Sequence, residues 1–389
     1  MSTQPKLASH TGLRGVAILC VVWDHYAIWC APFNPRTWPW PLDHAFNTGG
    51  IGMSIFFALS GFVIAYNYLG LDWMKAPAAS AANFAWLRFS RLYPCLLVFI
   101  AVTAIQPGTL QLGHRYPLVT GLSLMSFQSF YPVKLAGDLI TDNGYNLAWS
   151  ISTEIGLYAL FVFALVLHGQ MNRIFGAVAT KIAVLIGGAY VAAVAWLLWH
   201  PELAAYLADK LPVVGEPLTR DEAARWLLYW SPFCRFYDFL FGWLAAAMMR
   251  ANIFQDGRIA GGATMSFAIL VTRFIFHPDA YTMQSECAPL LTLIMVVGSQ
   301  SAIINRALSA PWLVYIGEIS YSLYLFHSVA THMASIPQSR EFSWPLFAGF
   351  LVLFCLCLVL ALSLATGLYR LIEMPGQRVL RERNPFRKQ

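Results

Sequence analysis

The stretch Leu13–Tyr26 reads LRGVAILCVVWDHY, an apolar run with an arginine near one end and a histidine eleven positions later. Eleven residues at ~100° each come to almost three helical turns, so Arg14 and His25 are predicted to share one helix face, ~16 Å apart along the axis. Polar groups inside a membrane helix usually face a protein interior or a watery cavity. The stretch therefore predicts a membrane helix with a functional face. In the alternative interpretation, Arg14 reaches a lipid headgroup and His25 is a hydrogen-bonded core histidine.

The composition of the whole chain indicates an integral membrane protein. Of its 389 residues, 58% are hydrophobic and 11% are charged, whereas soluble domains carry roughly 25% charged residues. Many apolar runs approach the ~20 residues that cross a bilayer as a helix, and none alternates as barrel strands do. The expected fold is all-α, a polytopic transmembrane helical bundle. It is expected to form one domain over residues 1–389, with a short basic cytoplasmic tail at 372–389. The seven cysteines show no metal-ligand spacing, so they are expected to be packing residues and no metal is predicted.

Ten runs are predicted to cross the membrane, namely 12–31, 49–69, 92–107, 147–168, 179–199, 226–249, 259–276, 287–304, 311–333 and 345–371. Short loops rich in lysine and arginine stay in the cytoplasm, and the basic tail after Tyr369 places the C-terminus there. The loop after the second span is basic too. These assignments agree only if an eleventh apolar run, 116–131, does not cross. That run is therefore expected to be re-entrant or interfacial, and both termini to be cytoplasmic.

This topology assigns a depth to several other polar residues. His25 is predicted ~9 Å from the external end of the first span, and Glu154 ~10 Å from the same face in the fourth. His327 also falls in the outer half of its span. Arg88 and Arg91 are expected side by side at the cytoplasmic mouth of the third span, because residues three apart are neighbours on a helix. Arginine forks suit phosphate oxygens, so the pair is expected to bind a phosphorylated ligand, although ordinary positive-inside anchors show the same pattern.

Six motifs in order along the chain resemble those of the acyltransferase 3 family of integral membrane acyltransferases. They are Leu13–Arg14–Gly15 followed by His25, FFALSGF at 56–62, RFSRLYP at 88–94, WSISTE at 149–154, SYSLYLFH at 320–327 and YRLIEMP at 369–375. Thr153 stands where the family pattern is expected to have valine. The resemblance implies transfer of an acyl group, usually acetyl, from a cytoplasmic coenzyme A thioester such as acetyl-CoA to an acceptor hydroxyl. The acceptor is commonly a cell-surface or secreted polysaccharide or its lipid-linked precursor.

Acyl transfer to an alcohol needs a base, because an alcohol is a poor nucleophile at neutral pH. His25 is the predicted catalytic base, since burial favours its neutral, proton-accepting form. As an alternative, His25 is the nucleophile of an acyl-histidine intermediate. Glu154 is the second predicted catalytic residue, and either orients the imidazole or binds the acceptor. Asp24 points ~100° away from His25 on a helix and is expected either to support a site residue from behind or to pack between helices. The residues expected to bind acyl-CoA are Arg14, Arg88 and Arg91. Those expected to bind the acceptor are Trp149, Ser152, Tyr324 and His327.

The resemblance thus implies an O-acetyltransferase of saccharides in the bacterial cytoplasmic (inner) membrane. One alternative is O-acylation of a small lipophilic molecule. Another is a non-enzymatic secondary transporter, which would predict repeats between halves that the sequence does not show. A non-catalytic sensor or assembly factor is the third. The expected partners are acyl-coenzyme A, a glycan and membrane lipids, without nucleic acid, and no feature indicates an oligomeric state.

Overall fold

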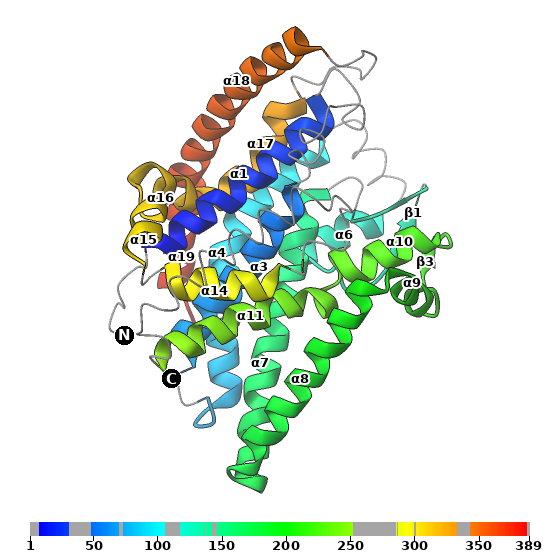
Figure 1. The fold of residues 1–389 in the computed structure, drawn as a ribbon, viewed down its shortest axis with the longest axis vertical. Helices are drawn as coiled ribbons and strands as arrows, with labels where there is room; N and C mark the ends of the chain where they lie inside the picture. Colours follow the sequence, from blue (N-terminus) through cyan, green and yellow to red (C-terminus); the bar gives the residue numbers. More distant parts are fainter. Residues whose placement is uncertain are drawn as a thin grey trace. The chain divides into compact units, whose positions relative to one another are not determined.

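The protein is described from a computed structural model that covers residues 8–30, 48–69, 73–105, 117–135, 137–141, 146–251, 285, 287–298, 301–332 and 343–386. The chain is almost entirely helical over these residues, which confirms the all-α prediction (Figure 1). It divides into two compact units. Unit 1 comprises residues 1–67 and 238–369, and unit 2 comprises residues 68–237 and 370–389.

Unit 1 is built around its first helix. The helices of unit 1 are α1 (Ala8–Cys30), α3 (Gly49–Tyr68, to Asn67), α11 (Pro232–Arg250, from Asp238), α14 (Ala288–Gly298), α15 (Ala302–Leu308), α16 (Pro311–Glu318), α17 (Ser320–His332) and α18 (Trp344–Leu368). Figure 1 shows α1 running beside α16 and α17, and these helices are in direct contact. The predicted functional helix is therefore surrounded by other helices of its own unit.

Glycines let α1 approach its neighbours at backbone distance. A Cβ atom on Gly12 would lie 1.7 Å from the carbonyl oxygen of Leu308, and one on Gly317 would lie 1.9 Å from that of Thr11. Real Cβ atoms cannot come so close, so a larger residue would push the helices apart. The small-residue positions therefore fix how closely α15 and α16 pack on α1, as is common between membrane helices.

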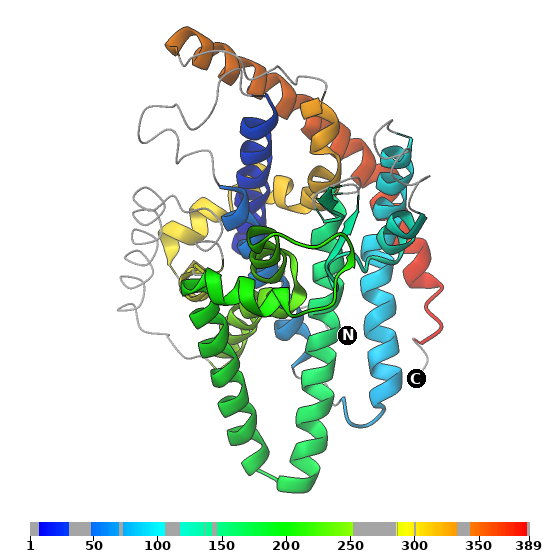
Figure 2. The ribbon, with the colours of Figure 1, turned by 90° about the vertical axis from the view of Figure 1, so that its right-hand side faces the viewer.

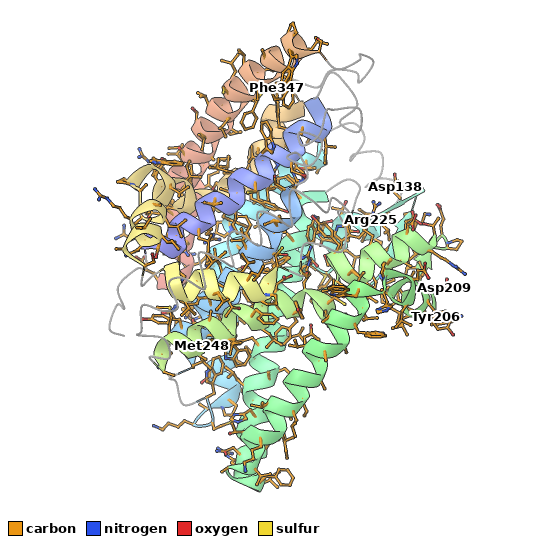
Figure 3. The ribbon with its side chains drawn as sticks, viewed as in Figure 1. Asp138, Tyr206, Asp209, Arg225, Met248 and Phe347 are labelled. Carbon is orange, nitrogen blue, oxygen red and sulfur yellow. The ribbon has the colours of Figure 1, made fainter. Side chains whose placement is uncertain are left out.

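Aromatic side chains fill the contact between α1 and α18. Tyr26 is fully buried and its ring lies 5.0 Å from that of Phe350, while the Trp23 ring lies 4.8 Å from that of Phe354. Phe347, labelled in Figure 3, packs against the same cluster. Because aromatic rings bury large apolar areas in fixed geometry, this cluster anchors the end of α1 that carries His25.

Unit 2 contains a long helical hairpin and the C-terminal helix. Its elements are α4 (Pro77–Ala104), α6 (Pro117–Met125), β1 (Val133–Leu135), β2 (Asp138–Leu139), η2 (Asn146–Ala148), α7 (Trp149–Phe175), α8 (Val178–Trp199), α9 (Pro201–Asp209), β3 (Val214–Gly215), α10 (Arg220–Arg225), η3 (Trp226–Trp230), the start of α11, most of η4 (Tyr369–Glu373) and α19 (Met374–Glu382). Gly176, at φ 54°, ends α7 and turns the chain into α8 (Figure 2).

A three-stranded sheet in unit 2 was not expected from the sequence. Its strand order is β2-β1-β3, with β2 antiparallel and β3 parallel to β1. Asp138 on β2 is labelled in Figure 3. Lys134 on β1 donates to the Glu222 carboxylate of α10 at 2.9 Å, and Thr219 forms a capping box with Glu222. Burial would raise the pKa of Glu222, but its hydrogen bonds with Lys134 and Thr219 outweigh that effect and lower it.

Among the described residues, five helices are long and apolar enough to cross a membrane, so the prediction of about ten spans is not confirmed. They are α3, α4, α7, α8 and the continuous helix Trp344–Glu382 that contains α18. The predicted runs 49–69 and 179–199 agree with α3 and α8 within one residue. The most apolar windows of α8 and of the last helix are only 11% and 17% buried. Their apolar side chains therefore face outward, where lipid can cover them.

Several predicted boundaries differ from the structure for identifiable reasons. The third run begins at Pro77 rather than at residue 92, because the alanine-rich segment before it favours a helix without being strongly apolar. The run 226–249 is interrupted at Pro232, which has no N–H to continue the preceding turn. The run 311–333 forms two helices that divide at Ile319, near the weak helix formers Gly317 and Ser320.

Two other predicted runs contain shorter helices than expected, and a third lies outside the described residues. The run 287–304 contains two helices, α14 and α15, instead of one. The run 116–131 contains the nine-residue α6, which at about 14 Å is shorter than the ~30 Å hydrocarbon core. Its re-entrant or interfacial position stays a prediction. The run 259–276 lies outside the described residues.

We predict that Gly242→Ala destabilises the protein. A Cβ atom there would lie 1.7 Å from the carbonyl oxygen of Ala58, where α11 crosses α3. The overpacking should lower the free energy of unfolding by about 1–3 kcal/mol, seen as a lower thermal midpoint of the purified protein in detergent. Gly187→Ala on α8 is the matched control, because a Cβ atom there meets nothing within 4 Å. Equal midpoints for the two variants would contradict this account of the α3–α11 contact.

Candidate active site

The centre of the candidate site in unit 1 is a pair of histidines from α1 and α17. His25 Nδ1 lies 2.7 Å from His327 Nε2, and the ring centroids are 5.0 Å apart with the planes inclined by 11°. The centroid-to-centroid distance exceeds the nitrogen-to-nitrogen distance by about two imidazole ring radii. Both nitrogens must then lie on the line that joins the centroids. The two rings are therefore edge to edge in nearly one plane, which is the geometry of an N–H···N hydrogen bond.

The backbone of α17 determines which nitrogens carry the protons. His327 Nδ1 lies 2.8 Å from the carbonyl oxygen of Tyr324 and 3.2 Å from that of Leu323. A carbonyl oxygen only accepts, so His327 Nδ1 must carry a proton. In a neutral ring Nε2 is then an acceptor, and the proton in the shared hydrogen bond belongs to His25 Nδ1. The lone pair of neutral His25 is therefore on Nε2.

The two histidines differ in exposure. His327 is fully buried, whereas His25 is half-buried. His327 therefore lies behind His25, where it can hold the His25 ring in place. The acceptor-binding role that the sequence predicted for His327 stays a prediction. The pairing spans 302 positions of the chain, so no local sequence pattern could have indicated it.

Aromatic side chains connect this histidine pair to Arg14 within unit 1. The Arg14 guanidinium lies 5.8 Å from the ring centroid of Phe56, which lies 6.4 Å from the Tyr324 ring. Tyr324 in turn lies 6.2 Å from the His327 ring. Arg14 and His25 thus belong to one continuous cluster with α3 and α17. Phe56 was not among the predicted site residues, although it begins one of the recognised motifs.

Asp24, next to His25 in sequence, stabilises the start of another helix. Its carboxylate accepts hydrogen bonds from the backbone N–H groups of Thr48 and Gly49 at the beginning of α3. A Cβ atom on Gly49 would lie 2.5 Å from the Asp24 carboxylate. Carboxylates cap helix N-termini because they satisfy unpaired N–H groups there. The geometry therefore supports the packing role expected for Asp24.

The second cluster is in unit 2 and contains the arginine pair. Arg88 and Arg91 lie on α4, and the Arg88 guanidinium is 5.5–5.9 Å from the ring centroids of Phe84, Tyr68 and Tyr158. Arg88 Nε is a buried donor without a hydrogen-bond partner among the described residues. Three aromatic rings thus hold the guanidinium by cation–π contacts, and one of its donors is unsatisfied.

Glu154 belongs to this arginine cluster through Tyr158. The Tyr158 hydroxyl, one helical turn further along α7, donates a hydrogen bond to the Glu154 carboxylate. Tyr158 also lies within electrostatic range of Arg88 and Arg91. The sequence analysis missed Tyr158, and its i, i+4 spacing from Glu154 was the available signal. The predicted effect of Glu154 on the His25 ring stays a prediction.

Ser152 and Trp149 hold a neighbouring segment of unit 2. Ser152 is fully buried, and its hydroxyl oxygen accepts from the backbone N–H of Ser129 at 3.0 Å. The Ser129 hydroxyl donates to the carbonyl oxygen of Trp149 at 2.8 Å. Ser126 nearby has a φ of 55°, so these bonds fix a strained turn after α6. The burial favours a packing role for Ser152, while acceptor binding by Ser152 and Trp149 stays a prediction.

The predicted site residues thus form two clusters. Those in unit 1 are Arg14, His25, Tyr324 and His327, and those in unit 2 are Arg88, Arg91, Trp149, Ser152 and Glu154. In the part of the chain that the structure describes, no three of His, Cys, Asp and Glu gather closely enough to hold a metal ion. The chemistry available at the two clusters is proton transfer by imidazole and binding of anions by guanidinium.

These properties define a class of protein, an apolar helical membrane protein equipped for proton transfer and anion binding. Comparison with known proteins then identifies the family. The chain belongs to the acyltransferase 3 family, whose model, described as an acyltransferase domain, matches residues 8–368. It is therefore an integral membrane protein of an acyltransferase family.

Two curated relatives agree with this assignment. The chain is 26% identical over 403 residues to "Acyltransferase MdmB" of Streptomyces mycarofaciens, covering 98% of this chain and 94% of the relative. It is 23% identical over 336 residues to "Nodulation protein 10" of Rhizobium leguminosarum bv. viciae, covering 82% of each. No solved structure matches the chain.

We predict that Ser152→Ala destabilises the protein without lowering acyl transfer per folded molecule. The change removes the acceptor of a buried N–H group, which should cost about 1–3 kcal/mol of unfolding free energy. Ser363→Ala is the control. The Ser363 side chain is exposed, and within the described residues its hydroxyl donates to the Val359 carbonyl oxygen of the same helix. Thermal midpoints and transfer rates, normalised to folded protein, measure the two effects. A normal midpoint with a large loss of transfer would instead favour acceptor binding by Ser152.

Proposed function

We propose that this acyltransferase moves an acetyl or other acyl group from cytoplasmic acyl-coenzyme A to a hydroxyl of a saccharide acceptor. The acceptor is a cell-surface or secreted polysaccharide or its lipid-linked precursor. The proposed location is the bacterial cytoplasmic membrane, with both termini in the cytoplasm. The His25–His327 hydrogen bond is the observation that carries the proposal, because it gives a half-buried imidazole a defined proton-accepting nitrogen. Family membership supports acyl transfer over secondary transport.

His25 Nε2 acts as the general base in the proposed reaction. It takes the proton of the acceptor hydroxyl as the hydroxyl oxygen attacks the carbonyl carbon of the thioester. The carbon–sulfur bond then breaks, and the coenzyme A sulfur takes the proton from the imidazolium. The products are the acylated acceptor and free coenzyme A, and His25 returns to its neutral form.

His327 positions the base and stabilises its charged form. When His25 is protonated, its Nδ1–H still donates to His327 Nε2, as the imidazolium donates to a carboxylate in serine hydrolases. A neutral imidazole provides this acceptor without burying a negative charge among apolar helices, where an isolated carboxylate would be costly. The same Nε2 lone pair could attack the thioester directly, and the acyl-histidine route stays open.

The arginine cluster is proposed to bind the phosphates of the donor. Arg88 and Arg91 are one turn apart on α4, and guanidinium forks match phosphate oxygens. The unsatisfied Nε donor of Arg88 supports an anionic ligand at this position. Arg14 is proposed to contact the phosphates or the pantetheine carbonyls of the same donor.

Acceptor binding is proposed for one residue of each cluster, Tyr324 and Glu154. Tyr324 lies one turn before His327 and can present its hydroxyl to a saccharide. Glu154 is proposed to bind an acceptor hydroxyl, or to act on the base as predicted from the sequence. O-acylation of a small lipophilic molecule is the alternative. Comparing the ester content of glycans and of small molecules from cells with and without the gene distinguishes the two.

We predict that glycans of cells lacking this gene lose an O-acyl group, which wild-type protein restores. His25→Ala should not restore it, because the base is gone. His327→Gln should restore part of it, since the glutamine oxygen can accept from His25 Nδ1–H. His327→Leu, which cannot accept, should restore less than His327→Gln, because His25 then loses the partner that keeps its proton on Nδ1. NMR and mass spectrometry of surface and secreted glycans measure the ester content.

Thermal midpoints of the purified variants provide the control for folding. Restoration of the ester by correctly folded His25→Ala protein would remove His25 from the mechanism. Equal activity of His327→Gln and His327→Leu would show that the reaction does not depend on the hydrogen bond between His25 and His327. Unchanged glycans in cells lacking the gene, with loss of an acylated small molecule, would replace the proposed acceptor by the alternative.

A further inference from the structure

The C-terminal helix α19 packs along α4, where the sequence predicted a short basic tail. The Trp86 indole N–H donates to the Leu380 carbonyl oxygen at 2.8 Å, and the Asn384 amide donates to the Asn83 side-chain oxygen at 2.8 Å. A Cβ atom on Gly376 would lie 2.6 Å from the Pro94 ring. Figure 2 shows the two helices side by side. The end of the chain is therefore fixed to the helix that carries the arginine pair.

These contacts define the register of the two helices. Residue numbers rise along α19 while those of their partners fall along α4, so the helices are antiparallel. Gly376 is level with Pro94 and Leu380 with Trp86. Arg381, next to Leu380, therefore lies within about one helical turn of Arg88 along α4. In agreement with this register, Arg381 is within electrostatic range of both Arg88 and Arg91.

With Arg381, the cluster has three guanidinium groups and the Glu154 carboxylate, so it keeps an excess of positive charge. Like charges near one another repel, although solvent screens the exposed Arg381 in part. Arg378, on the same helix, instead pairs with Glu382 at 3.4 Å and is highly exposed. An anionic ligand would relieve the repulsion among the three arginines. The buried, unsatisfied Nε donor of Arg88 is a separate sign that a ligand binds there.

We propose that Arg381 binds the ribose 3′-phosphate of the acyl-coenzyme A donor, so that α19 forms part of the donor site. This rests on the proposed function. The 3′-phosphate is at the end of coenzyme A remote from the thioester, and Arg381 is more exposed than Arg88. Arg88 and Arg91 then take the diphosphate, which lies nearer the acyl group. Three phosphate groups thus meet three guanidinium groups from two helices.

The experiment compares binding of acetyl-CoA and of acetyl-3′-dephospho-CoA to full-length protein in detergent by calorimetry. Wild-type protein should bind acetyl-CoA about tenfold more tightly than the dephospho form, the effect of one charge-assisted hydrogen bond. Arg381→Gln should lose about tenfold in affinity for acetyl-CoA and none for the dephospho form. Arg378→Gln is the matched control and should behave as wild type. Arg381→Lys, which keeps the charge, should retain part of the preference.

Several outcomes would overturn the inference. One is an Arg381→Gln variant that keeps the wild-type preference for the 3′-phosphate. Another is an equal loss of affinity for both ligands, because Arg381 would then not recognise the 3′-phosphate. If Arg88→Gln still abolishes acetyl-CoA binding in either case, the proposed function stands and only the role of Arg381 fails. Absence of acetyl-CoA binding by wild-type protein would overturn both.

Discussion

The hydrogen bond between His25 and His327 joins α1 to α17 and places two titratable rings among apolar helices. Buried polar groups are costly unless they are paired, and here each ring satisfies the other. The α17 backbone sets the direction of the bond by accepting from His327 Nδ1. A helix backbone thus determines which nitrogen of His25 can accept a proton. The proposed chemistry depends on this one constraint.

The packing of each unit supports the cluster that it contains. In unit 1, Gly12 and Gly317 allow α1 to approach its neighbours at backbone distance, and the aromatic cluster around Tyr26 anchors the end with His25. In unit 2, three aromatic rings surround Arg88, and α19 is hydrogen-bonded along the same helix. Positions that look like ordinary helix packing therefore hold the imidazole pair and the guanidinium groups in place.

Two long apolar runs were predicted closely from the sequence. The runs 49–69 and 179–199 match α3 and α8 because hydropathy changes sharply at their ends. Hydropathy could not find the first fifteen residues of α4, whose helix depends on alanine propensity. It also could not reveal that the basic segment after Glu373 is a helix, because that segment is ordered by contacts with Trp86 and Pro94.

The candidate site could be predicted residue by residue, but its pairings could not. His25, His327, Glu154 and Arg88 each carried a local signal, since each is a polar group in or beside an apolar run. Helical periodicity relates residues within one helix, so it gave no information on the contact between His25 and His327. Glu154 was expected to orient the His25 ring or to bind the acceptor, which stays a prediction, and its hydrogen bond from Tyr158 beside the arginines was not foreseen.

The tautomer of His25 tests this account most directly. Nitrogen-15 NMR of protein labelled in its histidine rings, with His25 assigned from a His25→Gln variant, reports which ring nitrogen is protonated. We expect neutral His25 to carry its proton on Nδ1 in the wild type, and to lose this preference in His327→Leu. A wild-type His25 protonated on Nε2 would contradict the account, because no lone pair would then be available on Nε2 to accept the proton of the acceptor.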